Sequence, residues 1–337
     1  MEDFKSFITE TKEKPYRLLI IVVATDADDP NKTGVLLEKQ AKIMGIDIYQ
    51  FDIKMGYTTV NKKNNLVMHN FVYEKDVLGK VIKEENDKKG WEVRPEDTVC
   101  LIRSSYVPGM RWAEQLRLHG IKTINSKYTQ IISDDKWLNY VAMKRCGIRQ
   151  PKTALIGHEN NIDGPIEEMG GKYPMILKTV KGTHGVGVIY VDSKKSLLAT
   201  VQLVHKLDDE VALLIQEYIK TPYDVRVMVL ENEVVAQLKR PVIKGDFRSN
   251  ISQGNKPEEI EITELEKEEC IKAAKCVNAV WVGVDFIPSK DREKIPPYMI
   301  EVNSSPGTGF IDEMNNMNIM KLLLEKFSNR DLWELDN

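Results

Sequence analysis

Residues 178–191 read KTVKGTHGVGVIYV, in which three glycines fall within six residues between runs rich in β-branched side chains. The spacing G-x-x-G-x-G matches neither the dinucleotide fingerprint G-x-G-x-x-G nor the P-loop G-x-x-x-x-G-K-[ST], both of which lead into a helix. Strands are expected on both sides here, so Gly182, Gly185 and Gly187 lie at the tip of a β-hairpin. Such a tip can fold over a polyphosphate and present backbone N–H groups to it. Taken alone, the cluster is better explained as a plain glycine turn.

The composition is that of an ordinary globular enzyme. The chain has 337 residues, 42% of them hydrophobic, enough for two or three domains with buried cores. Its 48 basic and 51 acidic residues give a net charge of −3, so no global field draws it to nucleic acid or to an anionic membrane. The apolar runs are strand-sized and the first residues lack the apolar segment of a signal peptide, which predicts a cytoplasmic protein without a membrane span.

The cysteines and histidines are scattered along the chain. No C-x-x-C pair occurs, and no histidines cluster with the right spacing for a metal. We therefore expect no metal or redox role for the cysteines, which are Cys100, Cys146, Cys270 and Cys276.

The first third of the chain is predicted to be a small α/β domain. Residues 17–25 and 46–53 have strand patterns, and a helical pattern between them ends at Gly45, which together indicate a βαβ unit with a parallel sheet. Residues 99–105 add another strand. Residues 54–89 have few periodic apolar positions, so they are expected to be irregular at the surface.

The remaining two thirds alternate strands and helices in an α+β pattern. A helix is expected to begin at Asp134, with Ser133 as its N-cap, and to end before Gly147. Ser193 is expected to cap the next helix, and Thr263 with Glu266 forms a capping box before a third. Further strands are expected at 173–180, 187–192, 212–219, 282–286 and 298–303, with a hairpin around residues 231–232.

Two lysines could contact phosphate oxygens. Lys178 lies on the strand that enters the glycine tip, and Lys136 lies on the helix after Ser133. Each lysine by itself is more often simply solvated, so the hypothesis rests on their combination with the glycines.

Three oxygen ligands are expected on neighbouring strands. Asp285 lies on a strand between apolar residues, and Glu301 and Asn303 are two apart on the next strand, so the latter two share one face. Carboxylate and amide oxygens suit Mg²⁺ that bridges nucleotide phosphates, and a hard cation would offset the cost of burying them. The alternative is a buried polar network without a metal.

Several charged residues lie between the glycine tip and the acidic strands. Asp224 and Arg226 share one face of a strand, and Arg240 and Arg248 follow on the returning strand and its loop. Arginines suit phosphoryl oxygens and the charge that spreads during phosphoryl transfer. As surface charges they would need no explanation, so only their position supports a role.

Six ordered motifs resemble those of the ATP-grasp ligases, and most closely the RimK-like branch, which contains the α-L-glutamate ligases that modify a ribosomal protein. The match covers roughly residues 133–309. The resemblance implies an ATP-grasp fold of α/β and α+β type, with an N-terminal α/β pre-ATP-grasp domain at 1–125, a central domain with the glycine tip at 126–215 and a C-terminal domain with the Mg²⁺ site at 216–337. The motifs are SDDKWL, ILKTVKGTHGVGV, QEYIK, DVR, KGDFRSN and MIEVNSSPG.

The resemblance also implies a role for each candidate residue. ATP would lie between two α+β lobes with Mg²⁺, or Mn²⁺, and three arginines would stabilise the acyl phosphate and the oxyanion of its adduct. Residues expected to contact ATP are Lys136, Lys178, Gly182, Gly185, Gly187, Gln216, Glu217, Tyr218, Ile219, Asp224 and Arg248. The Mg²⁺ ligands would be Asp285, Glu301 and Asn303, the catalytic arginines Arg226, Arg240 and Arg248, and the substrate contacts Arg103, Ser104 and Asn250. For Arg103, a plain surface position is an equal alternative.

The family reaction converts a carboxylate and ATP to an acyl phosphate, which an amine then attacks to give an amide or peptide bond. The expected partners are an amino acid or another carboxylate and an amine acceptor, which is a small molecule, a peptide or a protein tail, and family analogy implies a homo-oligomer. After GDFRSN the glutamate ligases usually continue with an arginine and two glycines, whereas residues 253–255 here read QGN. That difference leaves glutamate and a ribosomal acceptor open.

Two other functions remain open at this point. A kinase on the same fold would phosphorylate a hydroxyl and would need no amine. A regulatory protein that binds ATP without turnover would not need the acidic residues and Arg248, whose presence favours an enzyme.

Overall fold

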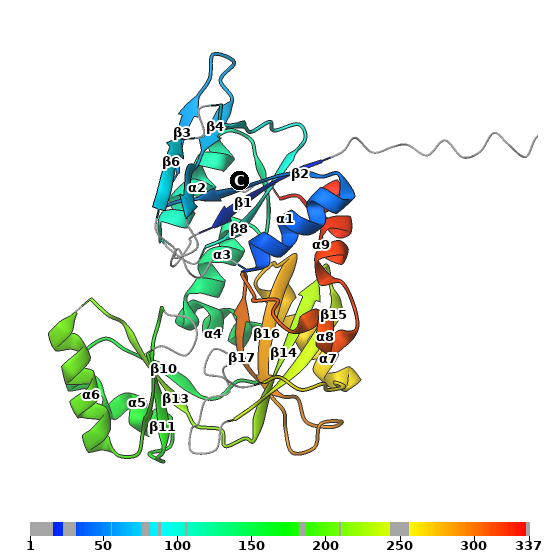
Figure 1. Cartoon of the computed structure of the whole chain (residues 1–337). Coiled ribbons are helices and arrows are strands. Elements are labelled where there is room, and N and C mark those ends of the chain that lie inside the picture. Colours follow the sequence, from blue (N-terminus) through cyan, green and yellow to red (C-terminus); the bar gives the residue numbers. More distant parts are fainter. Residues whose placement is uncertain are drawn as a thin grey trace, which may run out of the picture.

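The computed structural model describes residues 16–22, 32–54, 56–75, 81–86, 89–104, 107–181, 187–208, 210–242 and 256–334. The strands of these residues form five sheets, and the three sheets of four strands organise the molecule (Figure 1). The first sheet lies at the top of the view, the second at the lower left and the third at the lower right.

The first sheet is parallel, as the sequence predicts for a βαβ unit. Its strands lie in the order β2-β1-β8-β9, and every position of β1 and β8 is buried because both faces are covered. One face packs on α1, and the other packs on α2 and β4. The bounds are β1 Arg17–Val22, α1 Lys32–Met44, β2 Asp47–Asp52, β8 Thr98–Arg103, α2 Val107–Leu118 and β9 Lys122–Ile124.

The segment between β2 and β8 forms antiparallel strands, so the prediction of an irregular surface over 54–89 is wrong. A polar turn at residues 61–65, where Asn64 has a φ of 65°, separates the short apolar runs. Each run by itself is too short to show the alternation typical of a strand. All four residues of β4 are buried, and Leu66 and Met68 pack on the first sheet. The strands are β3 Tyr57–Val60, β4 Leu66–His69, β5 Phe71–Lys75, β6 Val81–Asn86 and β7 Trp91–Glu92.

The second sheet is antiparallel, in the order β10-β13-β11-β12, and its helices cover one face. Lys178 pairs with Val188 across β11 and β12, which confirms the hairpin predicted around the glycine tip. Ser193 caps α6 as predicted. The bounds are β10 Thr153–Ile156, η1 Glu159–Asn161, α5 Asp163–Glu168, β11 Met175–Thr179, β12 Val188–Val191, α6 Lys194–Leu207 and β13 Leu213–Glu217.

The third sheet is antiparallel, in the order β15-β14-β16-β17, with α7 on one face. The predicted hairpin is confirmed, since Glu231 and Asn232 have φ values of 57° and 90°, as a tight hairpin turn requires. Thr263 and Glu266 form the predicted capping box of α7. The bounds are β14 Tyr223–Leu230, β15 Glu233–Pro241, α7 Glu264–Cys276, β16 Trp281–Ile287 and β17 Tyr298–Asn303.

Two helices, α3 Lys127–Asp134 and α4 Lys136–Arg145, join the first sheet to the second. The single helix predicted to begin at Asp134 is therefore wrong. Asp135 caps α4 by accepting hydrogen bonds from the N–H groups of Trp137 and Leu138, whereas Ser133 lies inside α3. The sequence SDD offers three possible caps in a row, and only the packing of α3 selects the last.

The end of the chain returns to the first sheet. Helix α9 packs against α1, and Thr123 on β9 exchanges backbone hydrogen bonds with Glu334. One apolar core therefore joins the first and third sheets and includes Leu18, Ile20, Met228 and Trp281. The last elements are α8 Ile311–Asn315, α9 Ile319–Phe327 and η3 Arg330–Leu332.

Cys146 and Cys276 form a disulfide, which the cysteine spacing did not suggest. The two residues are 130 positions apart in the chain, and the fold brings together the ends of α4 and α7. Cys100 and Cys270 are buried free thiols.

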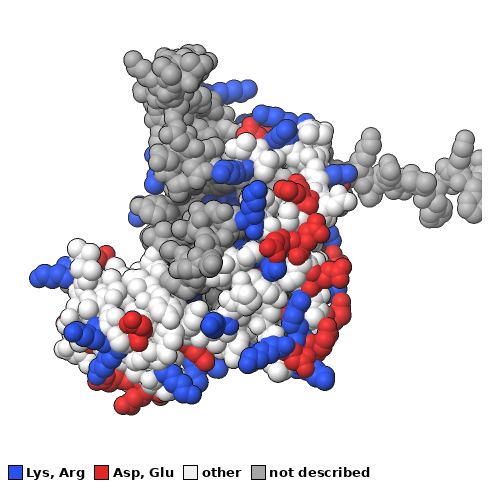
Figure 2. Space-filling model, turned by 60° about the horizontal axis from the view of Figure 1, so that its bottom comes forward, with Lys and Arg blue, Asp and Glu red and all other residues white. Residues whose placement is uncertain are grey.

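Two broad surface properties complete the description. Among the described residues, no helix has the length and apolar character needed to cross a membrane. Basic and acidic side chains are interspersed on the face drawn in Figure 2, so that face carries charge of both signs.

Asn125 connects the first sheet to the third, and its replacement tests that junction. Its Oδ1 accepts hydrogen bonds from the N–H groups of Val280 and Trp281, and its φ is 62°. We expect Asn125→Ala to lower the free energy of unfolding in urea by at least about 3 kcal/mol, from two unpaired N–H groups and a left-handed alanine. The control Asn64→Ala, with a φ of 65° on the surface, should cost about 1 kcal/mol. Equal losses in both variants would contradict the role of the hydrogen bonds.

Candidate functional site

One face of the third sheet is divided into an apolar half and a charged half. Alternate residues of β14 project from this face. At the end of the strand, Met228 and Leu230 belong to the apolar core shared with the first sheet. At its start, Asp224 and Arg226 form the charged half of the same face. Cross-strand pairing places Arg240 beside Asp224, then Asp285 beside Arg226, and Glu301 beside Asp285. The register therefore collects five charged residues from four strands at one end of the face.

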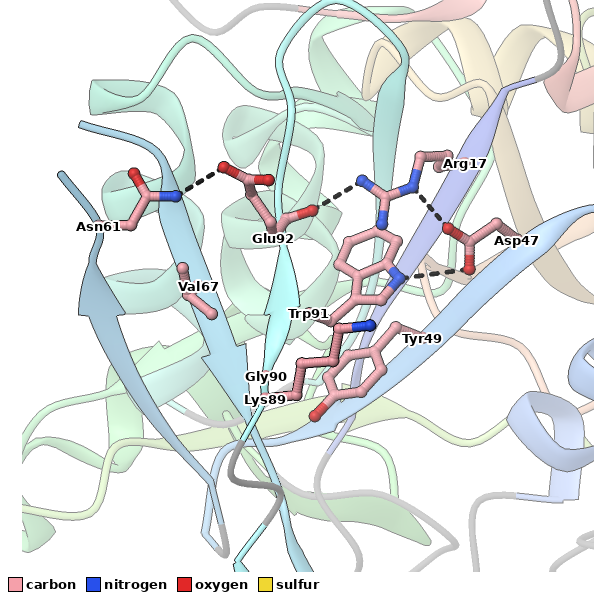
Figure 3. Close-up of a pocket in the computed structure, with 9 residues that line it drawn as sticks. All are labelled: Arg17, Asp47, Tyr49, Asn61, Val67, Lys89, Gly90, Trp91 and Glu92. Carbon is pink, nitrogen blue, oxygen red and sulfur yellow. Dashed lines mark hydrogen bonds and ion pairs between the residues drawn. The ribbon is translucent and has the colours of Figure 1, made fainter. Parts of the chain in front are cut away.

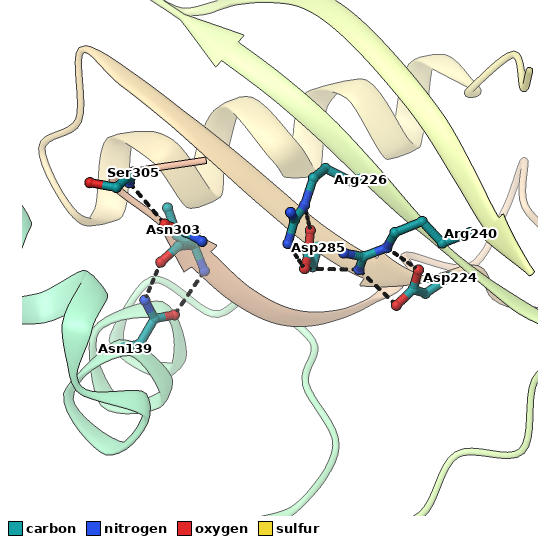
Figure 4. A network of polar contacts seen from close by, with 8 residues as sticks. Asn139, Asp224, Arg226, Arg240, Asp285, Asn303 and Ser305 are labelled. Carbon is teal, nitrogen blue, oxygen red and sulfur yellow. Dashed lines mark hydrogen bonds and ion pairs between the residues drawn. The ribbon is translucent and has the colours of Figure 1, made fainter. Parts of the chain in front are cut away.

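The arginines and aspartates of this face form a continuous network (Figure 4). Arg226 donates to both carboxylate oxygens of Asp285, at 2.7 and 2.6 Å. Arg240 donates to both oxygens of Asp224, at 2.6 and 2.8 Å, and also lies 2.8 Å from Asp285. The Arg240 side chain is 4% exposed and that of Arg226 is 17% exposed, so only Arg226 has a substantial surface facing solvent.

The network controls the protonation of its buried members. Burial by itself would raise the pKa of Asp285, but the charges and hydrogen bonds of Arg226 and Arg240 outweigh it and hold the pKa below its ordinary value. For Arg240, burial is outweighed by Asp285 and Asp224, which raise its pKa. Asp285 is therefore an anion at neutral pH.

The three expected metal ligands lie together at this end of the sheet. Asp285 pairs with Glu301, and Asn303 pairs with Gly283, so the three side chains project from one face of two adjacent strands. Two carboxylates and an amide oxygen fit a hard cation such as Mg²⁺. Among the described residues, no group of three His, Cys, Asp or Glu side chains could hold a metal, so the amide of Asn303 is needed for three ligands.

Two contacts orient Asn303 and its strand. The Oδ1 of Asn303 accepts a hydrogen bond of 2.8 Å from the N–H of Ser305. On the neighbouring residue, Asn139 of α4 donates to the carbonyl of Val302 and accepts from its N–H, at 2.8 and 3.2 Å (Figure 4). Asn139 was not predicted from the sequence, although its place one helical turn after Lys136 was a usable signal.

The two lysines come to the site from the second sheet and from α4. The N–H of Lys136 donates to the carbonyl of Val180, just after β11, which holds Lys136 near Lys178. The ammonium of Lys178 donates to the side-chain oxygen of Gln216 at 2.7 Å. Burial lowers the pKa of Lys178 to about 8, with Lys136 acting in the same direction and Glu301 opposing it. Helix α4 contacts both sheets here, because Lys136 bonds to Val180 after β11 and Asn139 bonds to Val302 on β17.

Other predicted ATP contacts lie along β13 and β12. The side chain of Gln216 is buried and donates to Thr153, while the N–H of Glu217 donates to the carbonyl of Lys152. Tyr218 packs edge-on against Tyr190, and Ile219 follows it after the end of β13. Gly182, Gly185, Arg248 and Asn250 lie outside the described residues.

Gly187 closes the hairpin at its second strand, where a side chain would be strained. Its φ is 77°, and a Cβ atom there would lie 2.5 Å from the hydroxyl of Thr179. The backbone of the hairpin can therefore approach β11 closely at this point.

Asp134, the last residue of α3, is a partly buried titratable group that the sequence patterns did not predict. Burial raises its pKa to about 7, while the charges of Lys181 and Lys136 act in the opposite direction. The repeated aspartates of SDD gave no reason to separate Asp134 from the capping residue Asp135.

Arg103 and Ser104 lie at the carboxyl end of β8, and both are buried, so the alternative of a surface arginine is wrong. A guanidinium N–H of Arg103 donates to the carbonyl of Pro306, in the loop that follows β17, at 3.1 Å. The fold thus brings this predicted substrate contact to the loop that begins directly after Asn303.

A cavity of about 660 Å³ lies at the opposite edge of the first sheet (Figure 3). Arg17, at the start of β1, lies over the ring of Trp91, which stacks on Tyr49. Arg17 and Trp91 both donate to Asp47, at 2.6 and 3.3 Å. Because Arg17 begins its strand and Arg103 ends the neighbouring parallel strand, the length of the sheet separates this cavity from the charged network.

Comparisons with known proteins agree with this arrangement. The family model of the RimK-like ATP-grasp domain matches residues 133–327. A probable alpha-L-glutamate ligase of Coxiella burnetii (strain RSA 493 / Nine Mile phase I) is 34% identical over 219 residues, which are 64% of this chain and 70% of that protein. A probable alpha-L-glutamate ligase of Vibrio vulnificus (strain YJ016) is 30% identical over the same shares.

Solved structures share the fold over nearly the whole chain. The ATP-grasp ligase PsnB complexed with minimal precursor has a TM-score of 0.60 at 17% identity and covers 93% of this chain and 98% of its own. A D-alanine–D-alanine ligase from Bacillus anthracis has a TM-score of 0.62 at 16% identity, with shares of 94% and 98%. The chain therefore has an ATP-grasp fold and belongs to the RimK-like ATP-grasp family, whose members are carbon–nitrogen ligases.

Proposed function

We propose that this ligase joins the carboxylate of an acidic peptide, protein tail or small molecule to the amine of an amino acid such as L-glutamate. ATP and Mg²⁺ are the proposed cosubstrate and cofactor, with Mn²⁺ as a substitute. The observation that supports the site most directly is that α4 bonds both to the second sheet, through Lys136 to Val180, and to β17, through Asn139 to Val302, where Glu301 pairs with Asp285. The second sheet thus supplies a cation for the phosphates, and the third sheet supplies the oxygen ligands for the metal.

The proposed reaction has two steps. The γ-phosphoryl group passes from ATP to a carboxylate oxygen of the acid, which gives an acyl phosphate and ADP. The amine nitrogen then attacks the acyl carbon and loses a proton, and the bond from that carbon to the phosphate oxygen breaks to release phosphate. No covalent bond to the protein forms in either step, so the chain supplies positioning and charge.

The charged residues divide these tasks. Lys136 and Lys178 would hold the phosphates, and Asp285, Glu301 and Asn303 would hold Mg²⁺. When bound, the ion neutralises negative charge on the phosphates. Arg226 keeps an exposed edge and would stabilise charge on the acyl phosphate. Arg240 is enclosed between Asp224 and Asp285, so we assign it a positioning role in place of the catalytic one expected from the sequence.

We also propose the division into domains at 1–125, 126–215 and 216–337. Each part holds one of the three main sheets, apart from the end of the chain, which returns to the first. The nucleotide would lie between the second and third parts.

Replacement of Glu301 tests the metal site without disturbing an arginine pair. We expect Glu301→Gln to lower the rate of ADP formation by about 100-fold and to raise the Mg²⁺ concentration needed for half-maximal rate, because a charged ligand is lost. ADP would be measured with N-acetyl-L-glutamyl-L-glutamate as acid and L-glutamate as amine. Glu264→Gln, at an 82% exposed side chain that starts α7, is the matched control and should keep full activity.

The same assay separates the proposed ligase from its alternatives. ADP release that requires the amine, with an amide product seen by mass spectrometry, supports the ligase. Phosphorylated product without an amine would indicate a kinase, and ATP binding without turnover would indicate a regulatory protein. Unchanged activity in Glu301→Gln would contradict the proposed metal site.

The lowered pKa of Lys178 predicts a pH dependence of ATP use. Because burial lowers this pKa to about 8, the ammonium loses its charge as the pH rises above that value and phosphate binding weakens. We expect kcat/KM for ATP, which reports on the free enzyme, to fall about tenfold per pH unit above the pKa. Lys178→Arg keeps its charge at these pH values, so its profile should stay flat there. An identical fall in both proteins would assign the titration to another group.

A further inference from the structure

Arg103 carries donors that the described structure leaves unused. The residue is 8% exposed at the carboxyl end of β8, and two of its three guanidinium nitrogens, Nε and Nη1, are buried without a hydrogen-bond partner. Nη2 donates to the carbonyl of Pro306 at 3.1 Å. Buried donors are almost always paired because an unpaired one is costly, so two on one charged group call for an explanation.

No counter-charge explains the burial of Arg103. Among the described side chains, no carboxylate forms an ion pair with it, and its nearest aromatic contact is the ring of Trp281, 5.3 Å from Cζ. The other described arginines of the site are occupied, since Arg226 holds Asp285 and Arg240 holds Asp224 and Asp285. Arg103 is therefore a buried cation whose anion is not supplied by the described residues.

Hydrogen bonds hold the loop after β17 against the end of β8. Ser304 donates to the side-chain oxygen of Gln130 at 3.0 Å, and Gln130 donates to the carbonyl of Ile102 at 3.3 Å. Thr308 and Thr33 share a hydrogen bond of 3.0 Å between their hydroxyls. These contacts place Arg103 beside the loop independently of its own bond to Pro306.

This position is close to the reacting groups. Pro306 follows Asn303 by three residues, so their Cα atoms are at most about 11 Å apart. In the first sheet, the chain runs from β1 to β2 on one side and later returns to β8 on the other side of β1, so the strand order reverses between β1 and β8. Ligands of parallel sheets bind at the carboxyl ends of the strands where the order reverses in this way. Arg103 ends β8 at this point of the sheet.

We propose that Arg103 binds the α-carboxylate that the incoming amino acid retains when its amine attacks the acyl phosphate. This inference rests on the proposed function, and it identifies the amine substrate as one that carries a free carboxylate. The amine is consumed in the new bond, while the carboxylate keeps its charge throughout and needs a cation. Nε and Nη1 are shielded from water, so an ion pair formed there lies in a medium of low dielectric constant.

The test compares amines with and without an α-carboxylate, since L-glutamic acid α-amide keeps only its γ-carboxylate. L-glutamate, L-glutamic acid α-amide and hydroxylamine would each be supplied with ATP, Mg²⁺ and N-acetyl-L-glutamyl-L-glutamate as the acid. In Arg103→Met we expect KM for L-glutamate to rise about 10–100-fold, the effect of losing a hydrogen-bonded charge. In the same variant, the rate of hydroxamate formation from hydroxylamine should change less than about threefold. The wild-type protein should prefer L-glutamate over its α-amide, and the variant should not.

A matched control separates binding from packing. Arg149 also donates to a proline carbonyl, that of Pro296 at 2.6 Å, and lies over an aromatic ring, that of Tyr298 at 3.7 Å. Arg149→Met should leave KM for L-glutamate unchanged, and Arg103→Lys should restore part of the loss. An equal loss with hydroxylamine and L-glutamate, or a raised KM for the acid, would overturn the proposal.

Failure of the proposed function has a different signature. It would appear as wild-type protein that makes neither hydroxamate nor ADP with any of the amines. Binding of L-glutamate to wild type and to Arg103→Met, measured by calorimetry with ADP and Mg²⁺ present, tests Arg103 in that case too. Equal affinity in the two proteins would overturn the role of Arg103, and an affinity about 10–100-fold weaker in the variant would support it.

Discussion

Asp285 is a negative charge held inside the molecule, and the arrangement of the site depends on how it is held. Burial disfavours the anion, but Arg226 and Arg240 flank the carboxylate from two neighbouring strands and keep it ionised. Asp224 in turn occupies Arg240 from the other side. Removing one partner from such a network leaves an uncompensated buried charge, so the four residues act as one unit.

The network can exist because one face of the third sheet has an apolar part, which packs in the core, and a charged part, which lies outside that core. Near Met228 and Trp281 the face is apolar and packs against the first sheet. Beyond them it is charged and carries Asp224, Arg226 and Asp285. Asn125 holds the junction at the apolar end, and Asn139 holds the strand of Glu301 and Asn303 from α4. The site therefore lies where the buried amide of Asn125 joins the first and third sheets and the buried amide of Asn139 joins α4 to β17.

Local patterns predicted those parts of the fold that depend on neighbours in the chain. The capping box at Thr263, the cap at Ser193 and the turn at residues 231–232 each involve residues within three or four positions of one another. The strands of residues 57–86 were not predicted, because strands of four to six residues are stabilised by pairing and packing with other elements. The choice of Asp135 over Ser133 as a cap and the pairing of Cys146 with Cys276 likewise depend on contacts between distant segments.

The sequence alone determined which residue types line the site. The two-residue strand repeat placed Glu301 and Asn303 on one face, and the glycine spacing excluded a phosphate loop on a helix. The tertiary structure decided how these groups are used. It paired Arg240 with two aspartates, left Arg226 partly exposed, and buried Arg103 beside Pro306 with two donors unused. The physical reason is that strand alternation is a property of the local backbone, whereas charge pairing and burial depend on the register between strands and on the packing of sheets that are distant in the chain.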